Sequence, residues 1–344
     1  MTTNVLVSFL PLMDVVDRDE FARRFPGVTL DAEAYDIPHG TLVDRTERPH
    51  DLPDDEQLTD RQRELFAAAD VCVTLNVPLR LATVAPRLRW VQGIGSGIGQ
   101  YMASGIDDRI YTNAAGTASP PIAEWVVAQI FSIHKRLPEH QDMQRRHEWR
   151  STVGSVIIGR KVTIVGLGAI GQEVAWRLGA LGLRVTGVRR RPWGDEPLPR
   201  GVEAMATQDR LLDLVADSDI VVACVPGTPT NADLFDADFF AAMPEGSMFV
   251  NVGRGSSVDE QALIEALTSG RLRGAAIDVA KHEPPAADDP LWDTPRLSIS
   301  PHSSASMEGY MQRVWDLFCD NLERFLAGQP MRNVVDMRAE YGSG

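Results

Sequence analysis

A glycine pattern near the middle of the chain restricts the possible folds more than any other feature. Gly166, Gly168 and Gly171 have G-x-G-x-x-G spacing, directly after the strand-like run KVTIV and at the opening of the helix-like run AIGQEVAWRL. Both contexts are needed for the dinucleotide-binding fingerprint of a βαβ unit. We therefore expect Gly166, Gly168, Ala169, Ile170 and Gly171 to bind a pyrophosphate at a helix N-terminus. A glycine-rich turn without any ligand is the alternative.

Strand-like and helix-like runs alternate regularly from Lys161 onward. The expected strands are KVTIVG, RVTGV, DIVVACVP, SMFVNVG, GAAIDV and RLSIS, and the expected helices span residues 169–181, 207–216, 236–242 and 259–269. Mostly apolar strands separated by helices are typical of a doubly wound parallel sheet. The expected fold class is therefore α/β.

The rest of the chain predicts a second α/β domain. Its apolar runs VLVSF, DVCVTL and LRWVQGI alternate with helix-like segments, and 344 residues exceed the roughly 250–300 at which one core tends to split. A helical stretch over 306–326 leads to MRNVVDM, which resembles a strand returning to the first domain. We expect two Rossmann-like or flavodoxin-like domains: a substrate domain of residues 1–117 and 306–344, and an NAD(P)-binding domain of residues 118–305. The active site would lie in the cleft between the domains.

Three consecutive arginines end the second expected strand of the NAD(P)-binding domain. An NAD enzyme carries Asp or Glu there, which binds the ribose hydroxyls and would repel a 2′-phosphate. Arg189, Arg190 and Arg191 stand there instead, and guanidinium groups bind phosphate through charge-assisted hydrogen bonds. The sequence thus predicts NADP(H) as the preferred cofactor, with NAD(H) possible. A solvated arginine run is the alternative, because arginine carries nearly all the positive charge of this chain.

The composition argues against several classes of function. The formal net charge of −14 opposes general nucleic-acid binding, and no apolar run reaches the roughly 18–20 residues of a membrane helix. Cys72, Cys224 and Cys319 lack the spacing of a metal site or redox pair, so we expect buried thiols and no bound metal. The opening MTTNVLVSFL shows no basic leader or cleavage site, so we expect a cytoplasmic protein.

Three further motifs stand at the carboxyl ends of successive expected strands. They are NVGRGSSVDEQAL, IDVAKHEPP and SPHSSA. Open α/β sheets bind their ligands at this edge. Together with the glycine fingerprint, the motifs occur in the order and approximate spacing of the D-isomer-specific 2-hydroxyacid dehydrogenase family, which the chain resembles over nearly its whole length. The pattern is most similar to that of glyoxylate/hydroxypyruvate reductases.

The resemblance implies that Arg254, Glu283 and His302 are catalytic residues acting on a small 2-keto or 2-hydroxy acid. Arg254 would bind the substrate carboxylate and polarise the carbonyl. His302 would also contact the substrate, as general acid in reduction and base in oxidation, while Glu283 orients it. Taken singly, a histidine or an arginine is usually structural, and Asp278 and His282 are alternatives to Glu283.

The same resemblance extends the cofactor site. Its implied further members are Val225, Pro226, Thr230, Val252, Asp278 and Ser304. The loop of Pro226 and Thr230 resembles the family's segment along the adenosine and ribose, and Asp278 resembles a residue near the nicotinamide carboxamide. Pro226 could instead only end a strand, and Asp278 could only cap the following turn.

Two loops of the substrate domain resemble the family's substrate loops. TLNVPL contains Asn76 and Val77, which would flank the acid or serve only as turn residues. QGIGSGIGQY offers the amides of Ser96 and Gly97 as an anion-binding nest for the substrate carboxylate. The family commonly has Asp at the position of Gly99, which leaves the local loop geometry open.

Trp149 aligns with a tryptophan that in some relatives reaches the partner's active site, with burial at a dimer interface as the alternative. We expect a homodimer, because the helical arm over 120–150 is expected to be exposed and to need a packing partner. Two rival functions stay open. One is oxidation of another small anion, such as formate or phosphite, and the other is dinucleotide sensing like that of the family's corepressors.

Overall fold

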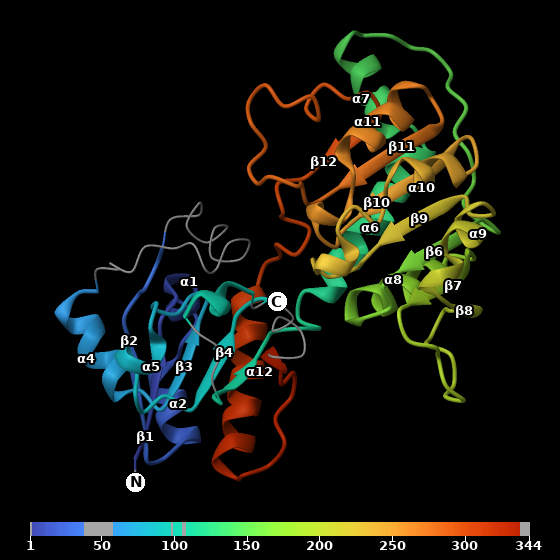
Figure 1. The fold of residues 1–344 in the computed structure, drawn as a ribbon. Coiled ribbons are helices and arrows are strands. Elements are labelled where there is room, and N and C mark those ends of the chain that lie inside the picture. Colours follow the sequence, from blue (N-terminus) through green and yellow to red (C-terminus); the bar gives the residue numbers. More distant parts are fainter. Residues whose placement is uncertain (1, 38–57, 98, 105–107, 338–344) are drawn as a thin grey trace. The chain divides into compact units, whose positions relative to one another are not determined.

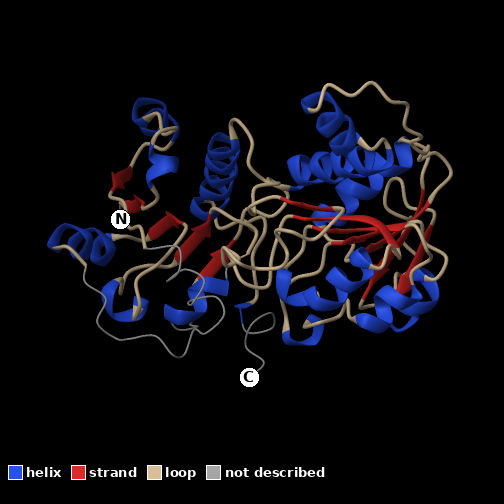
Figure 2. Ribbon diagram, turned by 90° about the horizontal axis from the view of Figure 1, so that it is seen from above, coloured by secondary structure: helices blue, strands red, loops and turns tan. Residues whose placement is uncertain are grey.

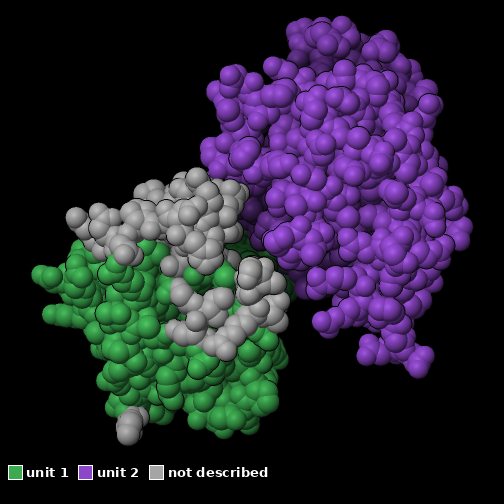
Figure 3. All heavy atoms as spheres, viewed as in Figure 1, with its two compact units in different colours: residues 1–118, 307–344 green, residues 119–306 purple. Residues whose placement is uncertain are grey.

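The computed structural model describes residues 2–37, 58–97, 99–104 and 108–337. The chain forms two units, which Figure 3 distinguishes by colour. Unit 1 comprises Met1–Ala118 and Met307–Gly344, and unit 2 comprises Ser119–Ser306. Each boundary lies one residue beyond the position expected from the sequence. Among the helices described, none has the length and apolar character needed to cross a membrane.

Unit 1 is built around a five-stranded parallel sheet (Figure 1). Its strands are β1 (Thr3–Val7), β2 (Val28–Ala32), β3 (Val71–Thr74), β4 (Trp90–Gly93) and β5 (Ile110–Thr112), in the spatial order β2-β1-β3-β4-β5. This is the flavodoxin-like strand order. The apolar runs predict β1, β3 and β4, which lie inside the sheet. They do not predict the two edge strands, which are β2, where no residue is buried, and β5, which is only three residues long.

The last long helix explains why the C-terminal segment belongs to unit 1. The helices among the described residues of this unit are α1 (Leu10–Met13), α2 (Arg18–Arg24), α4 (Asp60–Ala68), α5 (Leu81–Val84) and α12 (Tyr310–Leu326), with a 3₁₀ segment η1 at Gly99–Ser104. Val314, Phe318 and Leu322 recur at helical spacing on α12 and are fully buried in one cluster with strand residues of β1 and β3. The ring of Phe318 stacks on that of Trp90 with 5.3 Å between centroids.

The prediction that MRNVVDM forms a strand is wrong, although the segment does return to unit 1. Val334 forms a single antiparallel bridge with Thr112 of β5. The amide of Val335 donates to the carbonyl oxygen of Tyr111 at 2.9 Å. One bridge beside a parallel edge strand is enough to fix the segment, but it is too short to make a sixth strand.

Unit 2 contains a seven-stranded parallel sheet with helices on both faces, as Figure 2 shows. Its strands are β6 (Lys161–Val165), β7 (Arg184–Arg189), β8 (Ala204–Thr207), β9 (Ile220–Ala223), β10 (Ser247–Asn251), β11 (Leu272–Ile277) and β12 (Leu297–Ile299), in the spatial order β12-β11-β10-β9-β6-β7-β8. The order reverses between β6 and β9, the point where doubly wound sheets bind ligands. The predicted α/β class with two parallel sheets is confirmed. Only β8, an edge strand with exposed or half-buried residues, is absent from the sequence prediction.

The helices of unit 2 follow the predicted alternation with small changes. They are α6 (Ser119–His134), α7 (Leu137–Arg145), α8 (Ala169–Ala180), α9 (Leu211–Val215), α10 (Ala237–Ala242) and α11 (Glu260–Thr268), with 3₁₀ segments η2 (Gln208–Arg210), η3 (Pro229–Asn231) and η4 (Gly255–Ser257). The helix expected over 207–216 is split into η2 and α9. The expectation of an exposed arm over 120–150 is wrong for α6, which packs on α8 and buries Ile122, Val126 and Ile130.

The three cysteines are free thiols. Cys72 and Cys319 are buried, and Cys224 is partly exposed. Burial raises the pKa of Cys224 and of Cys319 to about 12, and it also raises the pKa of Cys72. All three are therefore protonated near neutral pH and are poor nucleophiles.

His134, the last residue of α6, couples the stability of unit 2 to pH. It is 1% exposed, and its Nδ1 hydrogen-bonds to Oγ of Ser155 at 2.8 Å. Burial, followed by the charges of Arg160 and Arg273, lowers its pKa from 6.5 to about 4. As the pH falls below 6.5, the unfolded chain therefore takes up this proton before the folded chain does.

We expect the free energy of unfolding to fall by about 3 kcal/mol between pH 6.5 and pH 4 because of this histidine, and to be independent of it above pH 6.5. Urea denaturation across this pH range measures the effect. His134→Gln, which cannot ionise, should flatten the slope, whereas His140→Gln on the exposed helix α7 should not. Parallel slopes in wild type and His134→Gln would contradict the assignment.

Candidate active site

The glycine fingerprint forms the turn between β6 and α8. Gly166 has φ of +96°, and a Cβ atom there would lie 2.7 Å from the carbonyl oxygen of Cys224. A Cβ atom at Gly171 would lie 2.2 Å from the carbonyl oxygen of Gly166. These positions therefore need glycine for the turn and for close packing of helix on strand. Gly168 differs, since a Cβ atom there would meet nothing within 4 Å.

The open space at Gly168 lies at the N-terminus of α8. Gly168 is the N-cap residue of this helix, and no side chain caps the first turn. The backbone amides that begin with Ala169 and Ile170 are therefore available to an anion, and the helix dipole favours negative charge there. An uncapped helix opening onto space at the switch point of the sheet fits the pyrophosphate of a dinucleotide.

The three arginines stand at the carboxyl end of β7, beside the glycine turn. Arg189 is the last residue of the strand and is half-buried, whereas Arg190 and Arg191 are exposed. The guanidinium of Arg189 lies over the ring of Trp193 with 4.9 Å to the centroid. Trp193 is not among the predicted site residues, although a tryptophan directly after RRRP is a signal that a cation–π contact to the arginines can form.

The other residues implied for the cofactor site follow β9 and β10. Val225 and Val252 are buried, while Pro226 and Thr230 are exposed. A Cβ atom at Gly253 would lie 2.6 Å from the carbonyl oxygen of Val225, so the two strand ends approach closely. Thr230 lies in η3, where its hydroxyl hydrogen-bonds to that of Thr228. All four therefore lie at the carboxyl edge of the sheet, on the β9–β10 side of the switch point.

Glu283 and His302 are brought into direct contact by the loops that follow β11 and β12. Nδ1 of His302 lies 2.7 Å from Oε2 of Glu283. The other carboxylate oxygen, Oε1, accepts the amide of Ala280 at 3.0 Å. The His302 side chain is 50% exposed and that of Glu283 is 23% exposed. The imidazole is thus held at one nitrogen while much of the ring stays accessible.

The surroundings favour the charged form of Glu283. Burial raises the pKa of this carboxyl, but the hydrogen bond and charge of His302, the amide of Ala280 and the charge of Arg254 lower it more strongly. The net result is a lowered pKa, so the carboxylate is ionised near neutral pH. An ionised partner at Nδ1 fixes the orientation of the imidazole ring.

Arg254 follows β10 and presents a guanidinium that is largely uncommitted. Its Nη1 donates to the carbonyl oxygen of Gly253 at 2.8 Å. Among the described residues no carboxylate forms an ion pair with it. The carbonyl oxygen of Arg254 accepts the Asn251 amide group at 3.1 Å and the Ser257 hydroxyl at 2.6 Å, which fixes its backbone. The remaining donors can therefore bind an anionic ligand.

Asp278 holds the loop that carries His302. Its Oδ1 accepts the amides of Ser303 and Ser304 at 2.8 and 2.9 Å and the hydroxyl of Ser300, and its Oδ2 accepts the hydroxyl of Ser304. The amide of His302 also donates to the carbonyl oxygen of Asp278 at 2.9 Å. This geometry favours the turn-capping alternative for the side chain of Asp278. It also leaves Glu283, rather than Asp278 or the exposed His282, as the partner of the imidazole.

The two predicted substrate loops of unit 1 follow the neighbouring strands β3 and β4. Asn76 is 2% exposed, and its Oδ1 has no hydrogen-bond partner among the described residues. Val77 is buried in the apolar core of the unit. Ser96 and Gly97 are half-buried, and the carbonyl oxygen of Ser96 accepts Nδ2 of Asn113 at 2.7 Å. Ser96 and Gly97 can therefore contribute main-chain amides to a site, while the Val77 side chain packs in the core.

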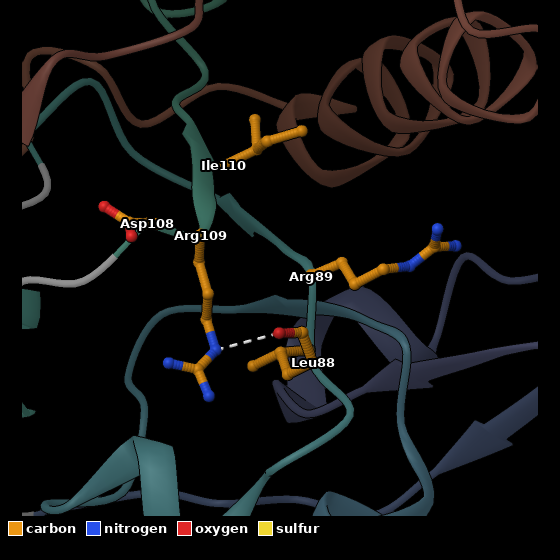
Figure 4. A pocket seen from close by; sticks show the side chains of 5 residues that line it. All are labelled: Leu88, Arg89, Asp108, Arg109 and Ile110. Carbon is orange, nitrogen blue, oxygen red and sulfur yellow. Dashed lines mark hydrogen bonds between the residues drawn. The ribbon is translucent and has the colours of Figure 1, made fainter.

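A surface hollow of unit 1 lies on the opposite edge of its sheet. Figure 4 shows its lining, Leu88, Arg89, Asp108, Arg109 and Ile110, which lies at the amino ends of β4 and β5. Nε of Arg109 donates to the carbonyl oxygen of Leu88 at 2.9 Å. Because open parallel sheets bind ligands at their carboxyl ends, this hollow is not the candidate site.

Known proteins resemble the chain in both sequence and fold. The family model described as D-isomer specific 2-hydroxyacid dehydrogenase, NAD binding domain, matches residues 127–304. A glycerate dehydrogenase from Methylorubrum extorquens is 28% identical over 328 residues, which covers 90% of this chain and 98% of that protein. A solved NADPH-dependent glyoxylate/hydroxypyruvate reductase from Sinorhizobium meliloti, in complex with NADP and sulfate, has a TM-score of 0.77 at 26% identity, covering 99% of this chain and 100% of that chain.

A D-3-phosphoglycerate dehydrogenase from Mycobacterium bovis is similar over a shorter part of its length. It is 30% identical over 287 residues, which covers 81% of this chain and 53% of that protein. This chain therefore spans about half the length of the phosphoglycerate dehydrogenases it matches. The other half of those proteins lies outside the aligned region.

Proposed function

The chain belongs to the D-isomer specific 2-hydroxyacid dehydrogenase family, and from this premise we propose that it reduces a small 2-keto acid to the D-2-hydroxy acid with NADPH. The substrate is of the glyoxylate or hydroxypyruvate type. The observation that carries the proposal is the 2.7 Å contact between His302 and Glu283, with the uncommitted guanidinium of Arg254 on the same sheet edge. Acid, orienting carboxylate and anion-binding cation are the groups that this reaction needs from the protein.

In this proposal the proton is carried by Nε2 of His302. Since Nδ1 faces the ionised Glu283, it keeps its hydrogen in both protonation states of the ring. The second proton of the imidazolium therefore sits on Nε2, and it passes to the alkoxide oxygen that forms at C2. In the reverse direction Nε2 removes the hydroxyl proton. A bound nicotinamide dinucleotide supplies or accepts the hydride.

Arg254 has two tasks in the proposal. Its free donors bind the substrate carboxylate, and they polarise the neighbouring carbonyl so that negative charge can develop on oxygen. In unit 1, the amides of Ser96 and Gly97 bind substrate anion, with Asn76 and the main chain of Val77 as further contacts. Asn76 supports this, because its buried and unpaired Oδ1 is an acceptor that a ligand hydroxyl can satisfy.

The cofactor is bound in the proposal by the glycine turn, the arginine run and the loops after β9 and β10. The residues are Gly166, Gly168, Ala169, Ile170, Gly171, Arg189, Arg190, Arg191, Val225, Pro226, Thr230 and Val252. At the nicotinamide end we place Ser304 and Asp278, the latter through the loop that its carboxylate holds. The pyrophosphate lies on the amides of α8, and the arginines bind the 2′-phosphate. The similar reductase from Sinorhizobium meliloti, which is in complex with NADP, supports this choice of cofactor.

We also propose a homodimer. The segment after α7 is apolar and exposed at Trp149, Val153, Val156 and Ile158, each more than half exposed. Several exposed large apolar side chains within one short segment are typical of protein interfaces. A second copy of the chain, which carries the same surface, is the partner that fits.

A panel of keto acids tests the proposed function. We expect NADPH oxidation with glyoxylate and hydroxypyruvate, and NADP⁺ reduction with D-glycerate, at higher kcat/KM than with D-3-phosphoglycerate, formate or phosphite. Absorbance at the nicotinamide band gives the rates, and chiral analysis of the product gives the hand. Turnover with formate or phosphite alone would contradict the substrate class. Tight NADPH binding without turnover of any of these compounds would instead indicate a dinucleotide sensor.

A further inference from the structure

The backbone at Ala280 and Lys281 is held at three points, one on the Val279–Ala280 peptide group and two on the Ala280–Lys281 peptide group. The amide of Lys281 donates to Oε1 of Glu260 at 2.6 Å, and the amide of Ala280 donates to Oε1 of Glu283 at 3.0 Å. A Cβ atom at Gly255 would lie 2.0 Å from both the carbonyl carbon and oxygen of Ala280. The backbone of Gly255 therefore packs directly on the Ala280–Lys281 peptide, and no side chain can stand between them.

This peptide joins two loops of the candidate site. Gly255 directly follows Arg254, and Ala280 is bonded to the carboxylate of Glu283. A shift of the peptide would therefore change both the distance between the two loops and the placement of Glu283 on His302. The Ala280–Lys281 peptide therefore lies between the loop of Arg254, which would bind the substrate carboxylate, and Glu283, which contacts the proton-carrying His302.

Glu260 is the side chain that fixes this peptide from the helix side. It is the first residue of α11, whose N-cap Asp259 accepts the amide of Ala262 at 3.2 Å. Its titratable neighbours are Asp289, His282 and Lys281. Burial raises the pKa of Glu260, and the Lys281 amide opposes this effect. Partial burial of a carboxylate costs free energy unless the carboxylate accepts a hydrogen bond. The bond from the Lys281 amide therefore favours one position of the Glu260 side chain.

The side chain of Lys281 anchors the same loop at a second point. Its Nζ lies 2.7 Å from Oδ1 of Asp233, whose own amide donates to the carbonyl oxygen of Ser256 at 3.0 Å. Both groups of the ion pair are partly exposed, so this contact contributes little by itself. The less exposed Glu260 carboxylate is therefore the stronger restraint.

We propose that Glu260 is a positioning residue for the reaction, because its carboxylate holds the Ala280–Lys281 peptide against Gly255 and so sets Glu283 on His302. The proposal rests on the proposed function of Arg254, Glu283 and His302. Glu260 itself touches neither substrate nor proton. Its contribution is the acceptor oxygen at Lys281, which a glutamine can also supply.

Two variants of similar size separate the acceptor from the bulk of the side chain. Glu260→Met removes the acceptor and is expected to lower kcat about tenfold, because a charge-assisted hydrogen bond is lost. Glu260→Gln keeps an oxygen and should retain most of the activity. Glu265→Met, on an exposed position of the same helix, is the control and should match the wild type. The dissociation constant of NADPH should be unchanged in all three.

The pH profile gives a readout that loss of folded protein cannot imitate. In Glu260→Met the contacts of Glu283 with Ala280 and His302 loosen, so the pKa of Glu283 rises towards its usual value. Glu283 then becomes neutral at a higher pH, and the acid limb of kcat/KM moves to higher pH. Carboxyl ¹³C NMR of labelled protein measures the same rise without turnover. If Glu260→Met does not fold, Glu260→Asp, which withdraws the carboxylate by one methylene, is judged by the same criteria.

The outcomes separate this proposal from the proposed function. An unchanged kcat and acid limb in Glu260→Met, with His302→Ala inactive, would overturn the positioning role alone. Equal impairment of Glu260→Gln and Glu260→Met would also overturn it, because the glutamine keeps the acceptor. Full activity of His302→Ala would overturn the proposed function, while the NMR titration of Glu283 would still decide the positioning role.

Discussion

Replacing His302 by alanine is expected to lower kcat for keto-acid reduction by about 10²- to 10⁴-fold, the usual range for loss of a general acid. The geometry gives the reason. Nδ1 is occupied by Glu283 at 2.7 Å, so the proton for the alkoxide comes from the other ring nitrogen. Alanine supplies no proton, and the carboxylate of Asp278 already accepts hydrogen bonds from the amides and hydroxyls of the same loop. The glycine turn lies elsewhere on the sheet edge, so the dissociation constant of NADPH should be nearly unchanged.

The backbone at His302 calls for a second variant. His302 has φ of +50°, a conformation that alanine adopts at a cost but asparagine tolerates well. His302→Asn therefore tests the loss of the imidazole with the least disturbance of the loop. His282→Ala, at an exposed position in the neighbouring loop, is the control and should keep wild-type kcat. Near-normal kcat in His302→Asn would refute the proton-transfer role.

The α/β class could be predicted because the inner strands are buried on both faces. Strands such as β6 and β9 show continuous apolar runs, and the helices between them carry apolar residues at helical spacing. The strands β2 and β8 escape prediction because their residues are half-buried or exposed and form no continuous apolar run. The short strand β5 is also missed, whereas the edge strand β12 is predicted by RLSIS, so an edge position alone does not hide a strand. The resemblance to the family is confirmed by the match over residues 127–304.

The sequence motifs predicted which residues belong to the candidate site, but not which of these residues contact one another. The letters HEPP and SPHSS place Glu283 and His302 in loops after neighbouring strands, which brings them to one edge. They do not decide whether Asp278 or Glu283 meets the imidazole, because that depends on how two loops fold back. Their catalytic and cofactor-binding roles stay predictions.

Contacts through the main chain were beyond the reach of sequence patterns. The packing of Gly255 on the Ala280–Lys281 peptide depends on how two loops meet, and the contact is made by main-chain atoms of both. Glu260 looks in the sequence like an ordinary acidic residue in the first turn of a helix. Trp193 looks like an isolated aromatic residue. Only the fold shows that Trp193 lies against Arg189 and that Glu260 accepts the amide of Lys281.

The arginine run determines the second large effect. We expect the wild type to prefer NADPH over NADH, and Arg189→Ala combined with Arg190→Ala to lower this preference, as a ratio of kcat/KM values, by about 10²- to 10⁴-fold. This range corresponds to two lost hydrogen bonds to a charged group at about 1.5–3 kcal/mol each. Because Arg190 is exposed and screened by solvent, the lower end applies.

The contact of Arg189 with Trp193 indicates that Arg189 contributes to the binding of the 2′-phosphate. A guanidinium held 4.9 Å from the ring centroid has lost part of its freedom before the phosphate arrives, so less entropy is lost on binding. The loss should appear in KM for NADPH, with kcat and the kinetics with NADH little changed. Arg184→Ala, at the amino end of the same strand, is the control, since its partner is Glu203. If the double variant keeps the preference for NADPH, the three arginines do not bind the 2′-phosphate and are only solvated surface residues. The preference would then have to come from the glycine turn.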